Sequence, residues 1–172
     1  INRLPNRVSY ELVTSVSNAQ MEVVDNMRNI GIDVKVFPSK HSIYFENSYG
    51  ENSNNRKQRV LSKADPFRKE YFTNIDAKVY HLGSLLADDF SMDVIKYLST
   101  KGRISIDVQG YLREVQGDKV VAVDWNDKLE ALKYTDILKV NEHEMVLLSG
   151  STDEKESARR FDAWGVNEVV LT

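Results

Sequence analysis

The sequence predicts an α/β fold in which a parallel sheet is flanked by helices. Two observations lead to this fold class. From residue 77 onward, short apolar runs alternate with segments of helical periodicity, and the connections between them are short. Parallel strands require crossover connections of this kind. The second observation is the composition, with 41% apolar and 28% charged residues in a chain of 172, which is typical of one globular domain.

Local patterns mark the first strands and helix of the chain. Tyr10 to Val16 has the apolar pattern of a strand, and Ser17 and Gln20 have the spacing of a capping box that opens a helix. Gly31 ends this helix, and Ile32 to Phe37 forms a second short apolar run. We expect one face of the helix to be shared by Val23, Met27 and Ile30.

A polar stretch then interrupts the pattern and predicts a projecting hairpin. Ser42 to Glu46 alternates in polarity, and Asn47 to Arg59 carries almost no side chain that can pack in a core. We expect a small β lid around residues 38–62, as an appendage of one incomplete domain that covers residues 1–172. Tyr44 and Phe45 would be exposed on a projecting lid, so the lid is a candidate surface for a homodimer.

The second half of the chain has the regular alternation on which the fold class depends. Strands are expected at residues 77–82, 103–107, 136–140 and 167–172, and helices at residues 91–100, 127–132, 141–149 and 151–164. In the first of these helices we expect Met92, Ile95 and Leu98 to point inward. The chain starts without Met and ends on a strand of the buried type, so we expect the domain to be truncated at both ends.

Polar side chains follow the ends of the predicted strands. Because ligands bind beyond the carboxyl ends of strands in open parallel sheets, we expect these side chains at one edge of the sheet. Carboxylates for a hydrated divalent cation, helix N-termini for phosphate and an arginine for a second anion suit phosphoryl transfer. The candidate site residues are Asp107, Arg113, Asn141, Glu144 and Thr172.

Most of these residues also have an ordinary structural explanation. Asn141 and Glu144 have the spacing of a capping box, and from spacing alone capping is the favoured interpretation. Asp107 can cap a turn at the end of its strand, and Arg113 is typical of a surface charge. Considered one at a time, the positions remain ambiguous.

Composition and motifs argue against several other classes. The net charge of -3 gives no electrostatic case for a nucleic acid partner, and no apolar run reaches the length of a membrane span. The chain has no cysteine, and its three histidines lack metal-ligand spacing. It contains neither a Walker phosphate loop nor a G-x-G-x-x-G motif. Without a signal peptide or a disulfide framework, we expect a cytoplasmic protein.

Several segments match, in order, those of the ribokinase-like (PfkB) family of kinases. The segment I-L-K-V-N-E-H-E-M-V-L-L-S-G at residues 137–150 resembles the N-x-x-E signature of the family. The segment S-I-D-V-Q-G-Y-L-R at residues 105–113 resembles its D-x-(N/Q)-x-x-x-R region at a strand end. V-V-L-T at residues 169–172 resembles the entry into its nucleotide-binding part, and S-I-Y-F-E-N at residues 42–47 resembles its lid.

The resemblance implies a kinase that transfers the γ-phosphate of ATP, in the presence of Mg²⁺, to a hydroxyl of a sugar or nucleoside. It implies that Asn141 and Glu144 serve the magnesium and triphosphate region, with Glu144 acting on the metal through water. Thr172 matches the start of the T-x-G nucleotide contact of the family. Asp107 and Arg113 would lie near the substrate or the transferred phosphoryl group.

The sequence also departs from the family pattern. Its 172 residues contain no G-x-G-D motif, which in the family supplies an anion hole and the catalytic Asp, and no G-G motif to hold a sugar. We therefore expect the base to lie beyond Thr172 and this chain by itself to be inactive. Two alternatives remain open, namely a non-catalytic ligand-binding or oligomerisation module of the same fold and another α/β nucleotide-binding enzyme.

Overall fold

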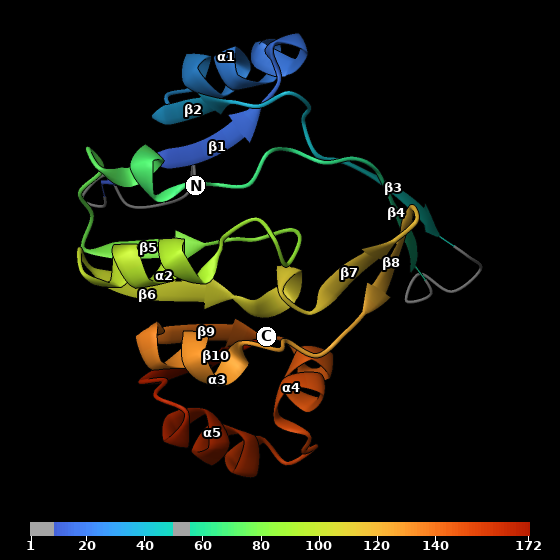
Figure 1. The fold of residues 1–172 in the computed structure, drawn as a ribbon, viewed down its shortest axis with the longest axis vertical. Helices are drawn as coiled ribbons and strands as arrows, with labels where there is room; N and C mark the ends of the chain where they lie inside the picture. The colour runs from blue at the N-terminus through green and yellow to red at the C-terminus, as the bar shows by residue number, and fades with distance from the viewer. Residues whose placement is uncertain (1–8, 50–55) are drawn as a thin grey trace. The chain divides into compact units, whose positions relative to one another are not determined.

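The structure, a computed structural model, describes residues 9–49 and 56–172 (Figure 1). Contacts within the chain divide it into two compact units. Unit 1 comprises the described residues up to Asp65, and unit 2 comprises Pro66–Thr172. The single incomplete domain expected over residues 1–172 stays a prediction.

A β–α–β crossover forms the centre of unit 1. Strand β1, Leu12–Val16, pairs in parallel with β2, Val34–Pro38, and helix α1, Met21–Asn29, connects the two. Gly31 follows the helix with a φ of +84°, a conformation that glycine adopts at no steric cost. The two strands and the helix predicted for this region are confirmed.

The start of α1 differs from the sequence prediction. A 3-10 turn, Asn18–Gln20, precedes the helix, and the Ser17 side chain makes no capping hydrogen bond. The Ser17 hydroxyl donates to the side-chain oxygen of Gln20 instead. The predicted capping box is therefore wrong, because the two side chains bond to each other rather than to backbone amides.

The packed face of α1 is also offset from the expected one. Val24 is the buried residue of the helix, whereas Val23 and Ile30 are 53% and 60% exposed. Of the three residues expected to share the packed face, Met27 is half-buried, whereas Val23 and Ile30 lie outside that face in unit 1.

An antiparallel hairpin follows in the region predicted to be a lid. Strand β3, Tyr44–Tyr49, pairs with β4, Arg56–Ser62, with an irregularity in register between Tyr44 and Phe45. Val60 of β4 is buried, and Tyr44 is exposed. The predicted hairpin is confirmed, and its function as a lid stays a prediction. Residues 50–55 of the predicted polar stretch lie outside the described residues.

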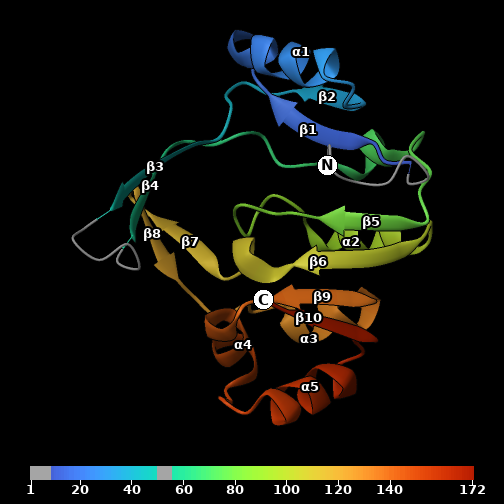
Figure 2. The same ribbon diagram turned by 180° about the vertical axis from the view of Figure 1, so that it is seen from behind.

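Four parallel strands make the main sheet of unit 2. In order across the sheet they are β10 (Glu168–Leu171), β9 (Ile137–Val140), β6 (Arg103–Asp107) and β5 (Val79–Leu82). The helices between successive strands of this sheet are α2 (Met92–Ser99), α3 (Lys128–Ala131), α4 (Glu142–Ser149) and α5 (Glu154–Ala163). Figures 1 and 2 show α2 and α3 on the same side of this sheet. The predicted parallel sheet with flanking helices is confirmed.

The core of unit 2 lies between the sheet and α2. Ile104 and Ile106 of β6 are fully buried, and so are Ile95 and Leu98 of α2, which packs against β6. Ile95 and Leu98 point inward as predicted, and Met92 is half-buried. Removal of such side chains from water is the dominant favourable term in folding, at about 25 cal/mol per Å² of apolar surface.

Unit 2 contains a second hairpin that was not predicted from the sequence. Strand β7, Arg113–Gln116, pairs antiparallel with β8, Lys119–Ala122, and Gly117 in the turn has a φ of +68°. The dipeptide Gly117–Asp118 between two alternating runs is a hairpin signal. The runs are short and carry charges, so they did not stand out as strands.

Gly110 occupies a position where packing leaves no room for a side chain. A Cβ at Gly110 would lie 2.4 Å from Ser84 Oγ and 2.5 Å from the Ser84 carbonyl oxygen. We expect Gly110→Ala to lower the free energy of unfolding by about 1–3 kcal/mol, the usual cost of overpacking. Gly83→Ala is the matched control, because its Cβ would meet only His81 Nε2, at 4.0 Å. Equal stability of the two variants in urea unfolding would contradict this close approach.

Candidate functional site

Parallel pairing brings the ends of three strands to one edge of the sheet of unit 2. Asp107 of β6 lies opposite Lys139 of β9, and β10 pairs with β9 on its other side. Asn141 follows β9 directly, and the Thr172 amide donates to the Val140 carbonyl over 3.0 Å. Asp107, Asn141 and Thr172 therefore lie at the same edge of the sheet, as the sequence predicted.

Asn141 and Glu144 form the capping box that starts α4. Asn141 Oδ1 accepts from the Glu144 amide over 2.9 Å, and Glu144 Oε2 accepts from the Asn141 amide over 2.9 Å. The structural role inferred from their spacing is confirmed. The amides of Glu142 and His143 remain without a hydrogen-bond partner among the described residues. This leaves two backbone donors at the positive end of the helix, where anions are favoured.

Asp107 is bonded from two sides. Its Oδ2 accepts from Lys139 Nζ over 2.9 Å, and its Oδ1 accepts from the Gln109 amide over 3.3 Å, which caps the short 3-10 turn that follows. The capping role considered for Asp107 is thus present. The Asp107 and Lys139 side chains are 23% and 38% exposed, so the ion pair is open to a ligand. Lys139 was not among the predicted site residues, although a lysine within an apolar strand is a visible signal.

Arg113 lies on a different element from the other candidates. It begins β7, opposite Ala122 of β8, and its side chain is half-buried. The structure therefore places Arg113 on the hairpin and not directly at the end of β6. Its role as an anion contact stays a prediction.

The acidic residues at the edge fit a magnesium ion held through water. The described ranges, 9–49 and 56–172, contain no group of three or more His, Asp or Glu side chains that can hold a metal ion. One oxygen of the Glu144 carboxylate is engaged by the capping box. Mg²⁺ commonly keeps several waters and binds through one or two carboxylates together with substrate phosphates. Glu144 therefore suits contact with the metal through water, and the residues do not form an inner metal cage.

Two buried hydroxyls follow the ends of β5 and β6. Ser84 Oγ and Tyr111 Oη find no hydrogen-bond partner within the described part of the chain. The Tyr111 ring stacks on Trp125, with 4.1 Å between ring centroids. Burial raises the pKa of the Tyr111 phenol far above its ordinary value, and the negative charge of Asp89 adds to this effect. Tyr111 therefore stays neutral in the folded protein at alkaline pH.

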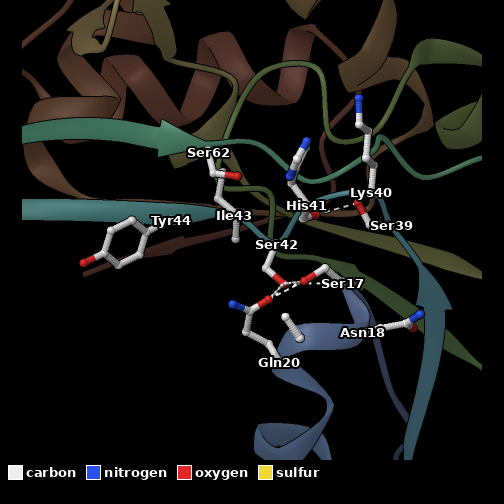
Figure 3. A pocket seen from close by; sticks show the side chains of 11 residues that line it. Ser17, Asn18, Gln20, Ser39, Lys40, His41, Ser42, Ile43, Tyr44 and Ser62 are labelled. Atoms are coloured by element: carbon white, nitrogen blue, oxygen red, sulfur yellow. Dashed lines mark hydrogen bonds between the residues drawn. The ribbon is translucent and has the colours of Figure 1, made fainter.

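Unit 1 contains a hollow of about 710 Å³ that sequence analysis did not identify (Figure 3). It lies between the turn before α1 and the segment that leads into β3. No pattern along the chain could have shown it, because the residues come from three separated segments. The lining residues are Ser17, Asn18, Ala19, Gln20, Ser39, Lys40, His41, Ser42, Ile43, Tyr44 and Ser62.

Comparison with solved structures identifies the fold. A pyrophosphate-dependent kinase in the ribokinase family, in a sulfate complex, is 29% identical, with a TM-score of 0.89 over 96% of this chain and 60% of that chain. The chain has the ribokinase-like fold. A pyrophosphate-dependent kinase of the ribokinase family complexed with a pyrophosphate analog and myo-inositol is also 29% identical. Its TM-score is 0.87, and the match covers 96% of this chain and 59% of that chain.

More distant structures share the ribokinase-like fold. The Burkholderia thailandensis nucleoside kinase in complex with inosine is 18% identical, with a TM-score of 0.63 over 94% of this chain and 52% of that one. The Halothermothrix orenii fructokinase is 15% identical, with a TM-score of 0.69, and the match covers 96% of this chain and 63% of that one. This ribokinase-like chain thus spans about 60% of the length of the first-named kinase.

Other comparisons add no further identification of the ribokinase-like chain. No protein-family model matches it, and no curated protein matches it. Within the described residues, none of the helices combines the length and the apolar character needed to cross a membrane.

The capping function of Asn141 in this ribokinase-like unit can be measured separately from any function in binding. We expect Asn141→Ala to lower the free energy of unfolding by about 1 kcal/mol, because the first turn of α4 loses its cap. Asn141→Ser retains a capping oxygen, so it should have nearly the stability of the wild type. Chemical unfolding compares the three proteins, and equal loss in both variants would exclude capping as the cause.

Tyr111 allows a test at alkaline pH. Tyr111→Phe removes a buried hydroxyl without a described partner and keeps the stack on Trp125, so stability at neutral pH should be equal or higher. Because the folded-state pKa is raised, the wild type should lose stability as the pH rises above about 10, where the phenol ionises only in the unfolded chain. Unfolding curves from pH 7 to 11 should show a smaller alkaline loss in Tyr111→Phe, and an identical loss would contradict the burial effect.

Proposed function

We propose that this chain is part of a kinase that phosphorylates a hydroxyl group of a small polyhydroxylated molecule. The observation that carries the proposal is the similarity to a pyrophosphate-dependent kinase of the ribokinase family, at 29% identity and a TM-score of 0.89 across 96% of the chain. The edge of the sheet supports it, because a helix N-terminus, a carboxylate and a partly open lysine lie at the carboxyl ends of parallel strands. Phosphoryl ligands bind at such edges.

The first candidates for acceptor and donor are a cyclic polyol and pyrophosphate. Three structures at 28% or 29% identity are kinases described as pyrophosphate-dependent, and two of these are named with myo-inositol. The fructokinase and the nucleoside kinase reach only 15% and 18% identity. A sugar or nucleoside acceptor with ATP as donor is the second candidate, supported by the motif resemblance to the wider family.

In this proposal the start of α4 holds the phosphates of the donor. The free amides of Glu142 and His143 donate to phosphate oxygens, and Asn141 offers its Nδ2 because its Oδ1 is taken by the cap. Glu144 would hold a magnesium ion through water, and such an ion would supply positive charge to the phosphates.

Lys139, Arg113 and Thr172 are proposed as further contacts to the phosphoryl group or the substrate, with Asp107 holding Lys139 in place. The acceptor oxygen attacks the phosphorus atom as the bond to the leaving phosphate or ADP breaks. The hydroxyl proton passes to a base outside this set of residues, since the chain contains no G-x-G-D motif. The 172 residues alone are therefore proposed to be inactive, and the protein is proposed to act in the cytoplasm.

The lid hairpin is proposed as the surface of a homodimer. Tyr44 of β3 is 59% exposed, and Leu61 of β4 is 47% exposed. A non-catalytic binding or oligomerisation module of the same fold is the alternative to the kinase. It predicts the same hairpin and the same edge but no product in any transfer assay.

The function is tested on the protein in the full length in which the cell makes it. The protein is incubated with Mg²⁺, with pyrophosphate or ATP, and with myo-inositol, ribose, fructose or inosine, and ³¹P NMR detects phosphate esters. We expect an ester of myo-inositol with pyrophosphate as donor. An ester formed only from ATP would select the second candidate, and the absence of an ester from every pair would support the non-catalytic module.

Glu144→Gln separates charge from capping at the proposed donor site. Glutamine can replace glutamate in a capping box, so the free energy of unfolding should stay within about 0.5 kcal/mol of the wild type. We expect the rate of ester formation to fall at least about tenfold, because the contact to magnesium loses its negative charge. An unchanged rate at several magnesium concentrations would remove Glu144 from the proposed site.

A further inference from the structure

Hydrogen bonds within the hollow of unit 1 occupy its acceptor atoms. Gln20 Oε1 accepts from Ser42 Oγ over 2.8 Å and also from the Ser17 hydroxyl. Ser42 Oγ in turn accepts from the Ser17 amide over 2.9 Å. Ser39 Oγ donates to one backbone carbonyl over 2.6 Å and accepts from one backbone amide over 2.7 Å. These bonds tie the turn before α1 to the segment before β3, so this wall of the hollow is held in place.

The polar groups that remain for a ligand are mainly donors. Because Gln20 Oε1 already accepts two hydrogen bonds, the group of this side chain that remains for a ligand is the donor Nε2. Lys40 and His41 also line the hollow, and their side chains have no hydrogen bond or ion pair to another described residue. Figure 3 shows both side chains extending in the same direction from neighbouring positions of the segment before β3. No Asp or Glu is among the lining residues.

We propose that this hollow binds the phosphoryl group of a small molecule. The hollow offers hydrogen-bond donors and two basic side chains, and no carboxylate lines it. Such a lining complements an anion that is rich in acceptor atoms. The volume of about 710 Å³ suits a small ligand, and the exposed Tyr44 ring offers a flat apolar surface beside the polar wall. The site is made by residues of unit 1 alone and does not depend on the phosphotransfer proposed for unit 2.

The charges next to the hollow set the expected strength of binding. Asp65 contacts the segment before β3, where its Oδ2 accepts from the Lys40 amide over 2.9 Å. It is therefore bonded to the backbone at Lys40 and not to the ammonium group. Its negative charge weakens the local positive field, and the basic side chains are exposed to salt. We expect affinity in the millimolar to submillimolar range that falls as ionic strength rises.

The test follows the His41 ring by NMR in the 172-residue chain. The chain has three histidines, and His41→Gln assigns the resonance. Inorganic phosphate, pyrophosphate and ribose 5-phosphate are titrated, with ribose as the neutral control. We expect a saturable shift of the His41 resonance with the phosphoryl compounds and none with ribose. The compound that binds most tightly identifies the source of the phosphoryl group as free phosphate, a donor or a phosphate ester.

Lys40→Gln provides the decisive comparison. This variant should raise the dissociation constant of the phosphoryl compound about tenfold, which is the effect of losing one charge-assisted contact. Lys63→Gln, at a position outside the lining, should leave that dissociation constant unchanged. Circular dichroism and thermal unfolding check that both variants fold.

The proposal is overturned if the His41 resonance does not move, if it moves equally with ribose, or if Lys40→Gln binds as tightly as the wild type. Because this binding needs no transfer chemistry, a positive titration stands even when no ester is formed in the transfer assay.

Discussion

Parallel hydrogen bonding between β6, β9 and β10 is the constraint on which the proposed site depends. These strands run in the same direction as immediate neighbours, so their last residues meet at one edge without any contact between side chains being required. The opposition of Asp107 and Lys139 follows directly from the register of β6 and β9. Apolar residues that face α2 fix the strands, and thus the core determines where the polar residues lie.

At the start of α4, structural and functional explanations of Asn141 and Glu144 use the same geometry. A helix begins with four backbone amides that lack partners within the helix, and the capping box satisfies two of them. The amides that remain, those of Glu142 and His143, are held in a fixed direction by the cap. The cap therefore does not compete with anion binding, because it orders the donors that an anion would use.

The sequence predicted the parallel sheet, the hairpin and the edge because each depends on periodicity or chain order. Ile95 and Leu98 are inward for the same reason. Prediction from the sequence failed where the outcome depends on which of two hydrogen bonds forms. At Ser17 and Gln20 the side chains bond to each other instead of capping the helix. Prediction also failed where residues distant in the chain meet, as in the pairing of Asp107 with Lys139 and in the hollow of unit 1. The order of strands along a chain indicates which strand ends share an edge, but spacing does not show which side chains bond to each other there.

The two proposed anion sites rest on different physical sources of positive potential. At α4 the source is a set of oriented backbone amides, whose partial charges do not titrate and whose effect is confined to the first turn of the helix. In the hollow the source is the ammonium of Lys40, which is exposed and therefore screened by salt, and the imidazole of His41 lies beside it. Binding in the hollow should consequently weaken more steeply with rising ionic strength than binding at α4, where the amides belong to the backbone. This difference follows from where the charge resides, and it distinguishes the sites even when both take the same phosphoryl ligand.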